Sequence, residues 1–215
     1  MRLGLYGGTF DPVHLGHLLL AESCREQLAL DEVWFIPTGN PPHKVGVEIA
    51  PGKARREMLE LALAGLPQFP VSRIEIDRPG PHYTVETLRL VREERPDDEL
   101  FVLIGADSLH DLHTWREPEA IASMARVVAV NRGLDAGVPR GFTGGFQLAS
   151  GATIQVESVT MPPIGISATD LRRRVAGGLS IRFQTPRAVE QYIRAHRLYR
   201  NSPPVENATA GAAGH

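Results

Sequence analysis

The sequence contains a single cysteine, few aromatic residues and almost no net charge. Cys24 is the only cysteine among 215 residues, so neither an internal disulfide nor a metal site built from several cysteines can form. The formal net charge of −2 gives no general attraction for nucleic acid or for an anionic membrane surface. A lone thiol is typical of the reducing cytoplasm, where we expect the protein to act.

Long apolar runs and a secretion signal are also missing. No stretch approaches the roughly 20 apolar residues that cross a bilayer. The N-terminal residues lack the basic-then-apolar order of a signal peptide, because Asp11 interrupts them. Length and composition predict one globular domain over residues 1–200, with a C-terminal helical part at about 166–200. The small and polar residues of 201–215 predict a disordered tail.

Short apolar runs alternate with helical patterns along most of the chain. Four runs predict strands, those over residues 2–6, 32–37, 99–105 and 126–131. Further strands are expected over 71–76 and 154–159, and helices over 51–66 and 186–199. The glycine-rich stretch 134–151 fits either a hairpin or a surface excursion. The alternation predicts an α/β fold with a doubly wound parallel sheet.

The opening stretch from Gly4 to His17 combines a strand, glycines and two histidines. Gly7 and Gly8 lack a Cβ, so we expect the backbone to turn sharply there and a ligand to approach closely. His14 and His17, three residues apart at a helix start, fall on one helix face. A helix N-terminus offers unpaired N–H groups and partial positive charge, so the stretch predicts a phosphate site. The plain alternative is a glycine turn followed by ordinary histidines.

The spacing of these glycines fits neither a Walker A loop nor the dinucleotide fingerprint. The run from His14 to His17 instead resembles the His-x-Gly-His motif with which nucleotidyltransferases related to class I aminoacyl-tRNA synthetases grip ATP phosphates. The longer run from Gly7 to His17, Gly-Gly-Thr-Phe-Asp-Pro-Val-His-Leu-Gly-His, is similar to bacterial nicotinate-nucleotide adenylyltransferases. This resemblance implies a Rossmann-like nucleotidyltransferase fold.

A second motif lies near the C-terminus. Ser167 is a good N-cap residue, and Asp170 three positions later gives a weak capping box. The segment resembles the family's Ile-Ser-Ser/Thr-Thr-x-Ile-Arg, which binds ATP phosphates, although Ala168 replaces a hydroxyl residue and Leu171 replaces isoleucine. The alternative is a capped helix followed by a solvated basic face. The resemblance implies contacts with ATP at Gly7, Gly8, Thr9, Phe10, His14, His17, Gly105, Asp107, Arg132, Ser167, Thr169 and Arg172.

Three other segments match the family on the side of the second substrate. They are the Asn40-Pro-Pro-His-Lys44 loop, the stretch around Thr84 and the loop that carries Trp115. Thr84 is a candidate N-cap, and Trp115 could stack on a flat ring. A surface loop, a simple cap and a packed tryptophan are the plain alternatives. The resemblance implies contacts with nicotinate mononucleotide at Gly8, Thr9, Asn40, Lys44, Thr84 and Trp115.

The chain shows no covalent nucleophile, since it has no Gly-x-Ser-x-Gly and Cys24 lies on the apolar side of its helix. An acceptor that attacks ATP through its own phosphate needs only alignment and charge neutralisation. We expect His14, His17, Lys44 and Arg172 to act in catalysis, with Mg²⁺ carried by ATP and no metal site on the protein.

The activity implied by the resemblance is transfer of the adenylyl group of ATP to nicotinate mononucleotide, which gives deamido-NAD and pyrophosphate. Phosphopantetheine adenylyltransferase shares the first motif, but does not explain Trp115 or the loop that ends at Lys44. A non-catalytic nucleotide sensor of the same fold is a further alternative. The sequence leaves open the preference between the acid and amide mononucleotides and the oligomeric state.

Overall fold

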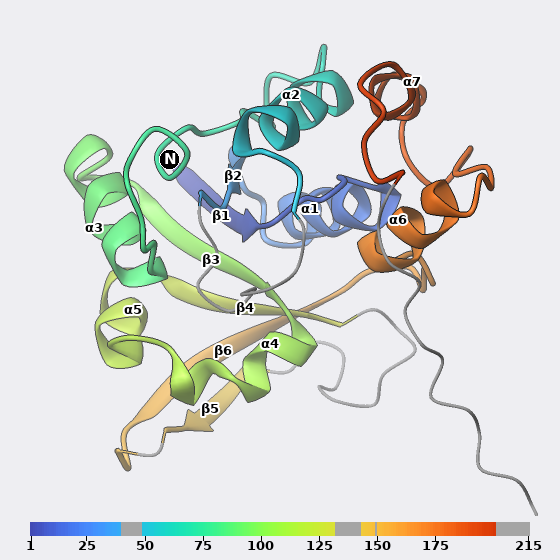
Figure 1. The fold of residues 1–215 in the computed structure, drawn as a ribbon. Coiled ribbons are helices and arrows are strands. Elements are labelled where there is room, and N and C mark those ends of the chain that lie inside the picture. Colours follow the sequence, from blue (N-terminus) through green and yellow to red (C-terminus); the bar gives the residue numbers. More distant parts are fainter. Residues whose placement is uncertain (40–48, 132–142, 149, 201–215) are drawn as a thin grey trace, which may run out of the picture.

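The computed structural model shows one six-stranded sheet with helices on both faces (Figure 1). It describes residues 1–39, 49–131, 143–148 and 150–200. The strand order is β2-β1-β3-β4-β6-β5, and every pairing is parallel except that of β5 with β6. The strands are β1 (Arg2–Gly8), β2 (Glu32–Pro37), β3 (Glu99–Gly105), β4 (Arg126–Asn131), β5 (Thr143–Gln147) and β6 (Thr153–Thr160). The predicted doubly wound sheet is confirmed.

The chain crosses from one side of β1 to the other. From β1 it continues to β2 on one side, and then returns to β3, which pairs with β1 on the opposite side. The strand order therefore reverses between β1 and β3. In open parallel sheets, ligands bind beyond the carboxyl ends of the strands at such a reversal.

Two hydrophobic layers cover the faces of the sheet. The first contains residues of α1 (Leu15–Gln27), α2 (Gly52–Ala62), α6 (Ala168–Ala176) and α7 (Arg187–Ala195). The second contains residues of α3 (Thr84–Glu94), α4 (Ala106–His110) and α5 (Pro118–Met124). Along β3, Phe101 and Leu103 belong to the first layer and Val102 to the second, as the two-residue period of a strand requires. Cys24 is buried in the first layer as predicted, and burial raises the pKa of its thiol to about 12.

The predicted strands over 32–37, 99–105 and 126–131 are observed residue for residue. The strand expected over 71–76 is wrong. Val71 makes only an isolated bridge with Phe35, and the Asp77 N–H then donates to the Arg73 carbonyl in a turn. Two helices are shorter than expected, because positive φ angles at Gly65 and Arg197 stop the chain from continuing as a helix. Within 134–151, β5 shows that the hairpin alternative holds for the described part.

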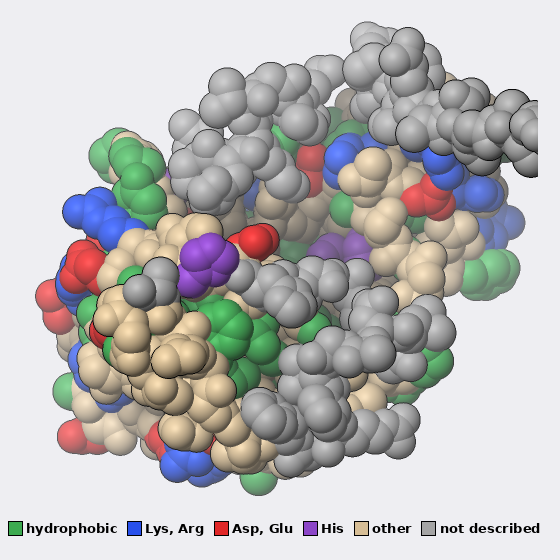
Figure 2. All heavy atoms as spheres, turned by 90° about the horizontal axis from the view of Figure 1, so that it is seen from below, with side chains coloured by type: hydrophobic (Ala, Val, Ile, Leu, Met, Phe, Trp, Pro, Cys, Tyr) green, Lys and Arg blue, Asp and Glu red, His purple; other side chains and the backbone are tan. Residues whose placement is uncertain are grey.

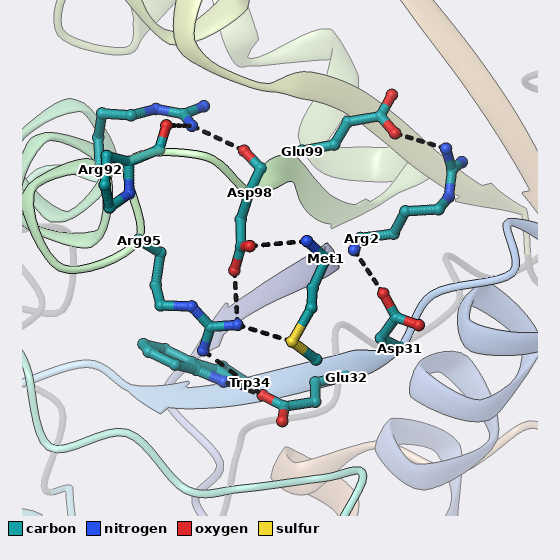
Figure 3. Close-up of polar contacts among 10 residues, drawn as sticks. Met1, Arg2, Asp31, Glu32, Trp34, Arg92, Arg95, Asp98 and Glu99 are labelled. Atoms are coloured by element: carbon teal, nitrogen blue, oxygen red, sulfur yellow. Dashed lines mark hydrogen bonds and ion pairs between the residues drawn. The ribbon is translucent and has the colours of Figure 1, made fainter.

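Charged side chains gather at the amino edge of the sheet, opposite the carboxyl ends of the strands (Figure 3). Arg95 pairs with Asp98 at 2.6 Å, and its guanidinium lies 5.6 Å from the centre of the Trp34 ring. Arg2 pairs with Glu99 at 2.5 Å. The Arg2–Glu99 pair is half-exposed and worth little, and none of these residues lines the carboxyl edge. Within the described residues, no helix has the length and apolar character needed to cross a membrane.

The fold predicts a contrast between two leucines of α2. Leu59 is fully buried in the first hydrophobic layer, whereas Leu61 is 40% exposed. Leu59→Ala should lower the free energy of unfolding by about 2–5 kcal/mol because it leaves a cavity. Leu61→Ala makes the same change in the same helix and should cost less than about 1 kcal/mol. Urea unfolding of both variants tests this packing, and equal losses would contradict it.

Candidate active site

The loop after β1 turns at Phe10, whose φ is 49°. The expectation that Gly7 and Gly8 make the turn is wrong, because both still belong to β1. Their missing side chains matter in another way. A Cβ on Gly8 would lie 2.9 Å from the Phe10 ring, whereas a Cβ on Gly7 would meet no atom within 4 Å. Gly8 therefore makes room for Phe10, and Gly7 borders open space.

The two histidines lie together at the start of α1. His14 is the N-cap residue, and its ring stacks on that of His17 with 3.7 Å between the centroids. The His14 main-chain N–H donates to Nδ1 of His17 at 3.2 Å. Because Nδ1 accepts this bond, the proton of a neutral His17 lies on Nε2. The buried Phe10 ring contacts His17 edge-on at 5.0 Å and supports it from the core.

The second motif contacts this loop directly. The Arg172 guanidinium donates from Nη1 to the main-chain carbonyl of Asp11 at 2.7 Å, although the two residues are 161 positions apart. Its Nη2 donates to Thr169 Oγ1 at 3.3 Å. Ser167 caps α6 as predicted, since its Oγ accepts the Asp170 N–H at 3.1 Å. Figure 1 shows α6 beside the start of α1. The two segments predicted to bind phosphate therefore contact each other.

The C-terminal segment also fastens the opening loop. The Tyr199 hydroxyl donates to Oδ1 of Asp11 at 2.5 Å. The Leu15 N–H donates to the Gln184 carbonyl at 3.0 Å, so this donor of the α1 start is used within the protein. Asp11 is 2% exposed, and burial raises the pKa of its carboxyl although Tyr199 and Arg172 act in the opposite direction. Burial and the neighbouring Asp11 likewise raise the pKa of Tyr199.

A buried arginine joins three segments behind the site. Arg55 of α2 is 1% exposed, and burial lowers the pKa of its guanidinium. It donates to the carbonyls of Ala50 at 2.9 Å, Thr9 at 2.9 Å and Gly39 at 3.1 Å. These carbonyls belong to the segment before α2 and to the loops that follow β1 and β2. Arg55 therefore sets the relative position of the loops at the carboxyl edge.

A pocket of about 220 Å³ opens at the carboxyl edge, between β1 and β3. Leu5, Ile36, Leu88, Val102 and Ile104 give it apolar walls, while its polar lining includes Thr9, Thr84, Glu75 and His82, with Trp115 beside them. The N-cap of α3 is Tyr83, and Thr84 is the first helical residue, so the expected capping role of Thr84 is wrong. Thr84 nevertheless lines the pocket at the helix N-terminus, where N–H groups lack intrahelical partners.

The sequence pattern of the cytidylyltransferase-like family matches residues 5–174 of the chain. A probable nicotinate-nucleotide adenylyltransferase of Thermomicrobium roseum is 49% identical over 200 residues, which cover 93% of this chain and 92% of the relative. One of Thermus thermophilus is 50% identical over 200 residues, which cover 93% and 100%. The chain belongs to the nicotinate-nucleotide adenylyltransferase family.

Solved structures share the fold at much lower sequence identity. The Plasmodium falciparum nicotinic acid mononucleotide adenylyltransferase complexed with NaAD aligns with a TM-score of 0.71 and 16% identity over 92% of this chain and 97% of that one. The predicted Rossmann-like nucleotidyltransferase fold is confirmed.

The structure brings most of the predicted site residues of this nucleotidyltransferase together. Thr9, Thr84 and Trp115 line the pocket with both glycines, whereas the histidines follow Asp11 in the loop that Arg172 of α6 contacts. In Figure 2, histidine side chains (purple) are seen near the centre of the face and to the left of it, and several Lys and Arg side chains (blue) lie at the upper right. Gly105 ends β3, and Asp107 follows it in α4. Asn40, Lys44 and Arg132 lie outside the described residues.

Sequence reasoning missed the buried polar residues around the site. Arg55 lies three and four positions before the apolar Met58 and Leu59, so the helical period itself could have indicated that it is buried. Glu75 stands between two isoleucines, where alternation suggests a solvent-facing side chain. The sequence pattern therefore gives no indication that Glu75 is buried. Within the described part of the chain, no group of three His, Cys, Asp or Glu side chains is arranged to hold a metal ion.

The Tyr199–Asp11 contact predicts a difference between two tyrosines. Tyr199→Phe leaves the buried Oδ1 of Asp11 with only the Ala50 N–H, 3.3 Å away, and should lower the free energy of unfolding by about 1–3 kcal/mol. Tyr192→Phe is the matched control, because the Tyr192 hydroxyl donates to Glu57 at the surface. Its cost should stay below about 1 kcal/mol. Chemical unfolding measures both, and a harmless Tyr199→Phe would contradict the fastening role of Tyr199.

Proposed function

We propose that the chain transfers the adenylyl group of ATP to nicotinate mononucleotide and releases deamido-NAD and pyrophosphate, as a step of NAD biosynthesis in the cytoplasm. The observation that carries this proposal is the bond from Arg172 to the Asp11 carbonyl. It joins two phosphate-binding motifs next to a pocket that begins at Gly7, Gly8 and Thr9. The names of the relatives that are about 50% identical support the same activity.

ATP is proposed to lie over the opening loop and the start of α6. His14, His17 and Arg172 supply donors and positive charge, and the hydroxyls of Ser167 and Thr169 are exposed beside them. Main-chain groups from Gly7 to Phe10, together with Gly105, Asp107 and Arg132, complete the proposed ATP site.

Nicotinate mononucleotide is proposed to occupy the pocket between β1 and β3. The Trp115 ring then covers the pyridine ring, and the N-terminus of α3 at Thr84 receives the carboxylate. Asn40 and Lys44 are proposed to reach the acceptor from the loop after β2. This arrangement sets the phosphate of the acceptor beside the loop that holds ATP.

The reaction is proposed to be a direct displacement. A phosphate oxygen of nicotinate mononucleotide attacks the α-phosphorus of ATP, and the bond to pyrophosphate breaks in line with the attack. Negative charge then builds on the α-phosphate. The Nε2–H of His17 is the donor we assign to that charge, because Nδ1 already accepts the His14 N–H. Arg172 and His14 neutralise the remaining phosphates.

ATP is proposed to enter as its magnesium complex, so that the metal arrives with the substrate. Asp11, the carboxylate of the opening loop, is buried and accepts hydrogen bonds from Tyr199 and Ala50. The groups assigned to the phosphates are donors and cations, which contact phosphate oxygens rather than a metal. The metal supplies further neutralisation of the triphosphate.

A panel of acceptors tests the proposal. Pyrophosphate release is measured with ATP and either nicotinate mononucleotide, its amide or phosphopantetheine. The highest kcat/KM is expected with nicotinate mononucleotide, with deamido-NAD identified by mass. Activity with phosphopantetheine alone would establish the other adenylyltransferase. Binding of both nucleotides without pyrophosphate release would establish a nucleotide sensor.

The role of His17 gives a sharper prediction. His17→Ala should lower kcat about a hundredfold or more, since a preorganised donor at developing charge is typically worth that much. His196→Ala is the control, because His196 stacks on Tyr192 at the end of α7 and has no place in the proposed site. A loss below about tenfold in His17→Ala would contradict the assigned role.

A further inference from the structure

A buried carboxylate lies in the wall of the acceptor pocket. Glu75 is only 7% exposed, and it lines the pocket together with Thr84, His82 and Trp115. Its Oε1 accepts a hydrogen bond from Thr87 Oγ1 at 2.7 Å. Its Oε2 is buried and has no hydrogen-bond partner among the described residues. Glu75 does not belong to any of the segments that we assign to the phosphates.

Glu75 also lacks a full ionic partner. None of the ion pairs within 4.0 Å among the described residues includes it. His82, Arg78 and Arg55 act on it electrostatically. Arg78 donates from Nε to the Ile74 carbonyl, its Nη2 is 3.5 Å from Nδ1 of His82, and Arg55 donates to three main-chain carbonyls. Burial raises the pKa of the Glu75 carboxyl more than Thr87, His82, Gly39 and Arg78 lower it. The charge is therefore costly in the protein alone.

The chemistry of the proposed acceptor supplies a partner for this charge. The ring nitrogen of a pyridine nucleotide is bonded to the ribose, so it is quaternary and carries a permanent positive charge. The apolar walls of the pocket reduce the screening of an interaction between this charge and a carboxylate. The face of the Trp115 ring favours a cation as well.

We propose that Glu75 recognises the positive charge of the pyridinium ring and makes the acceptor pocket selective for pyridinium nucleotides over nucleotides with a neutral ring. The inference rests on the proposed function. It identifies the positive charge of the ring as the feature that the pocket recognises. Glu75 is a specificity-determining residue, and the bonds that form and break lie on the phosphates.

A ribose hydroxyl is the competing partner for Oε2. A hydroxyl needs only a hydrogen-bond acceptor, which a glutamine would provide without a buried charge. A cation is stabilised by the charge itself, which favours the ring nitrogen. The carboxylate that nicotinate carries on the same ring is separately accommodated by the partial positive charge at the start of α3, where Thr84 is the first residue.

The test removes the charge and keeps the shape. In Glu75→Gln the side-chain carbonyl can still accept the Thr87 hydroxyl. Its kcat/KM for pyrophosphate release is measured with ATP and two acceptors. One is nicotinate mononucleotide, and the other is the 3-carboxyphenyl C-riboside 5′-phosphate, in which carbon replaces the ring nitrogen. The two share the carboxylate, ribose and phosphate and differ in the ring charge. If the neutral acceptor does not turn over, its inhibition constant replaces kcat/KM.

The wild type should prefer the charged acceptor. Glu75→Gln should lower kcat/KM for nicotinate mononucleotide about tenfold to a hundredfold, mainly through KM, as expected for losing a charge pair in a poorly screened site. The neutral acceptor should change less than about threefold, so that the preference largely disappears. Glu75→Asp keeps the charge and should keep the preference. Glu93→Gln, an exposed change on α3, should leave both acceptors unaffected.

Three outcomes would overturn the inference. An equal loss with both acceptors would place the contact on the shared ribose, and no loss with either would remove Glu75 from recognition. If Glu75→Gln does not fold, the wild type decides, because equal kcat/KM for the charged and neutral acceptors contradicts recognition of the ring charge. A wild type that releases no pyrophosphate with nicotinate mononucleotide refutes the proposed function instead, which separates the two failures.

Discussion

The hydrogen bond from the Arg172 guanidinium to the Asp11 carbonyl is the contact on which the rest of the site depends. A reaction between two phosphate compounds must overcome their mutual repulsion, so donors and cations have to be gathered before the substrates arrive. This contact joins the start of α1 to the start of α6, and Tyr199 fastens the same loop from the end of the described chain. Residues distant in sequence thereby form one polar surface, which includes the Arg172 guanidinium, at one sheet edge.

Buried polar groups stand directly behind that surface. Asp11, Arg55 and Glu75 are each less than a tenth exposed. Burial raises the pKa of the two carboxyls and lowers the pKa of the guanidinium, which in each case favours the neutral form. Arg55 offsets this cost with three carbonyl contacts to the loops, and Asp11 with contacts to Tyr199 and Ala50. Among the described residues, Oε2 of Glu75 has no hydrogen-bond partner, and a ligand is the partner that we propose for it. Polar groups that break the rule of an apolar interior concentrate where ligands bind.

The sequence predicted the central strands well because burial on both faces leaves a continuous apolar run, as in Val33 to Ile36. The strand predicted over 71–76 is wrong. This segment alternates in hydrophobicity, but it lies along the edge of β2 and contacts it through isolated hydrogen bonds, such as that from the Ser72 N–H to the Phe35 carbonyl. The sequence identified the two segments that Arg172 brings into contact, because their residue types and spacing are local. It missed Glu75 because the alternation around it suggests a solvent-facing side chain. For Arg55 the helical period indicates burial, but the three carbonyls that it contacts come from tertiary structure.

Topology and side chains carry different parts of the function. The reversal of strand order between β1 and β3 determines where a ligand can lie, and a neighbour with 16% identity shares it at a TM-score of 0.71. The same reversal would serve many nucleotides, so the fold alone selects none. Selection has to come from groups that differ in their response to the ring, and in this pocket those groups are the face of Trp115, the start of α3 and the charge of Glu75. An apolar pocket amplifies such charges, because little water remains to screen them.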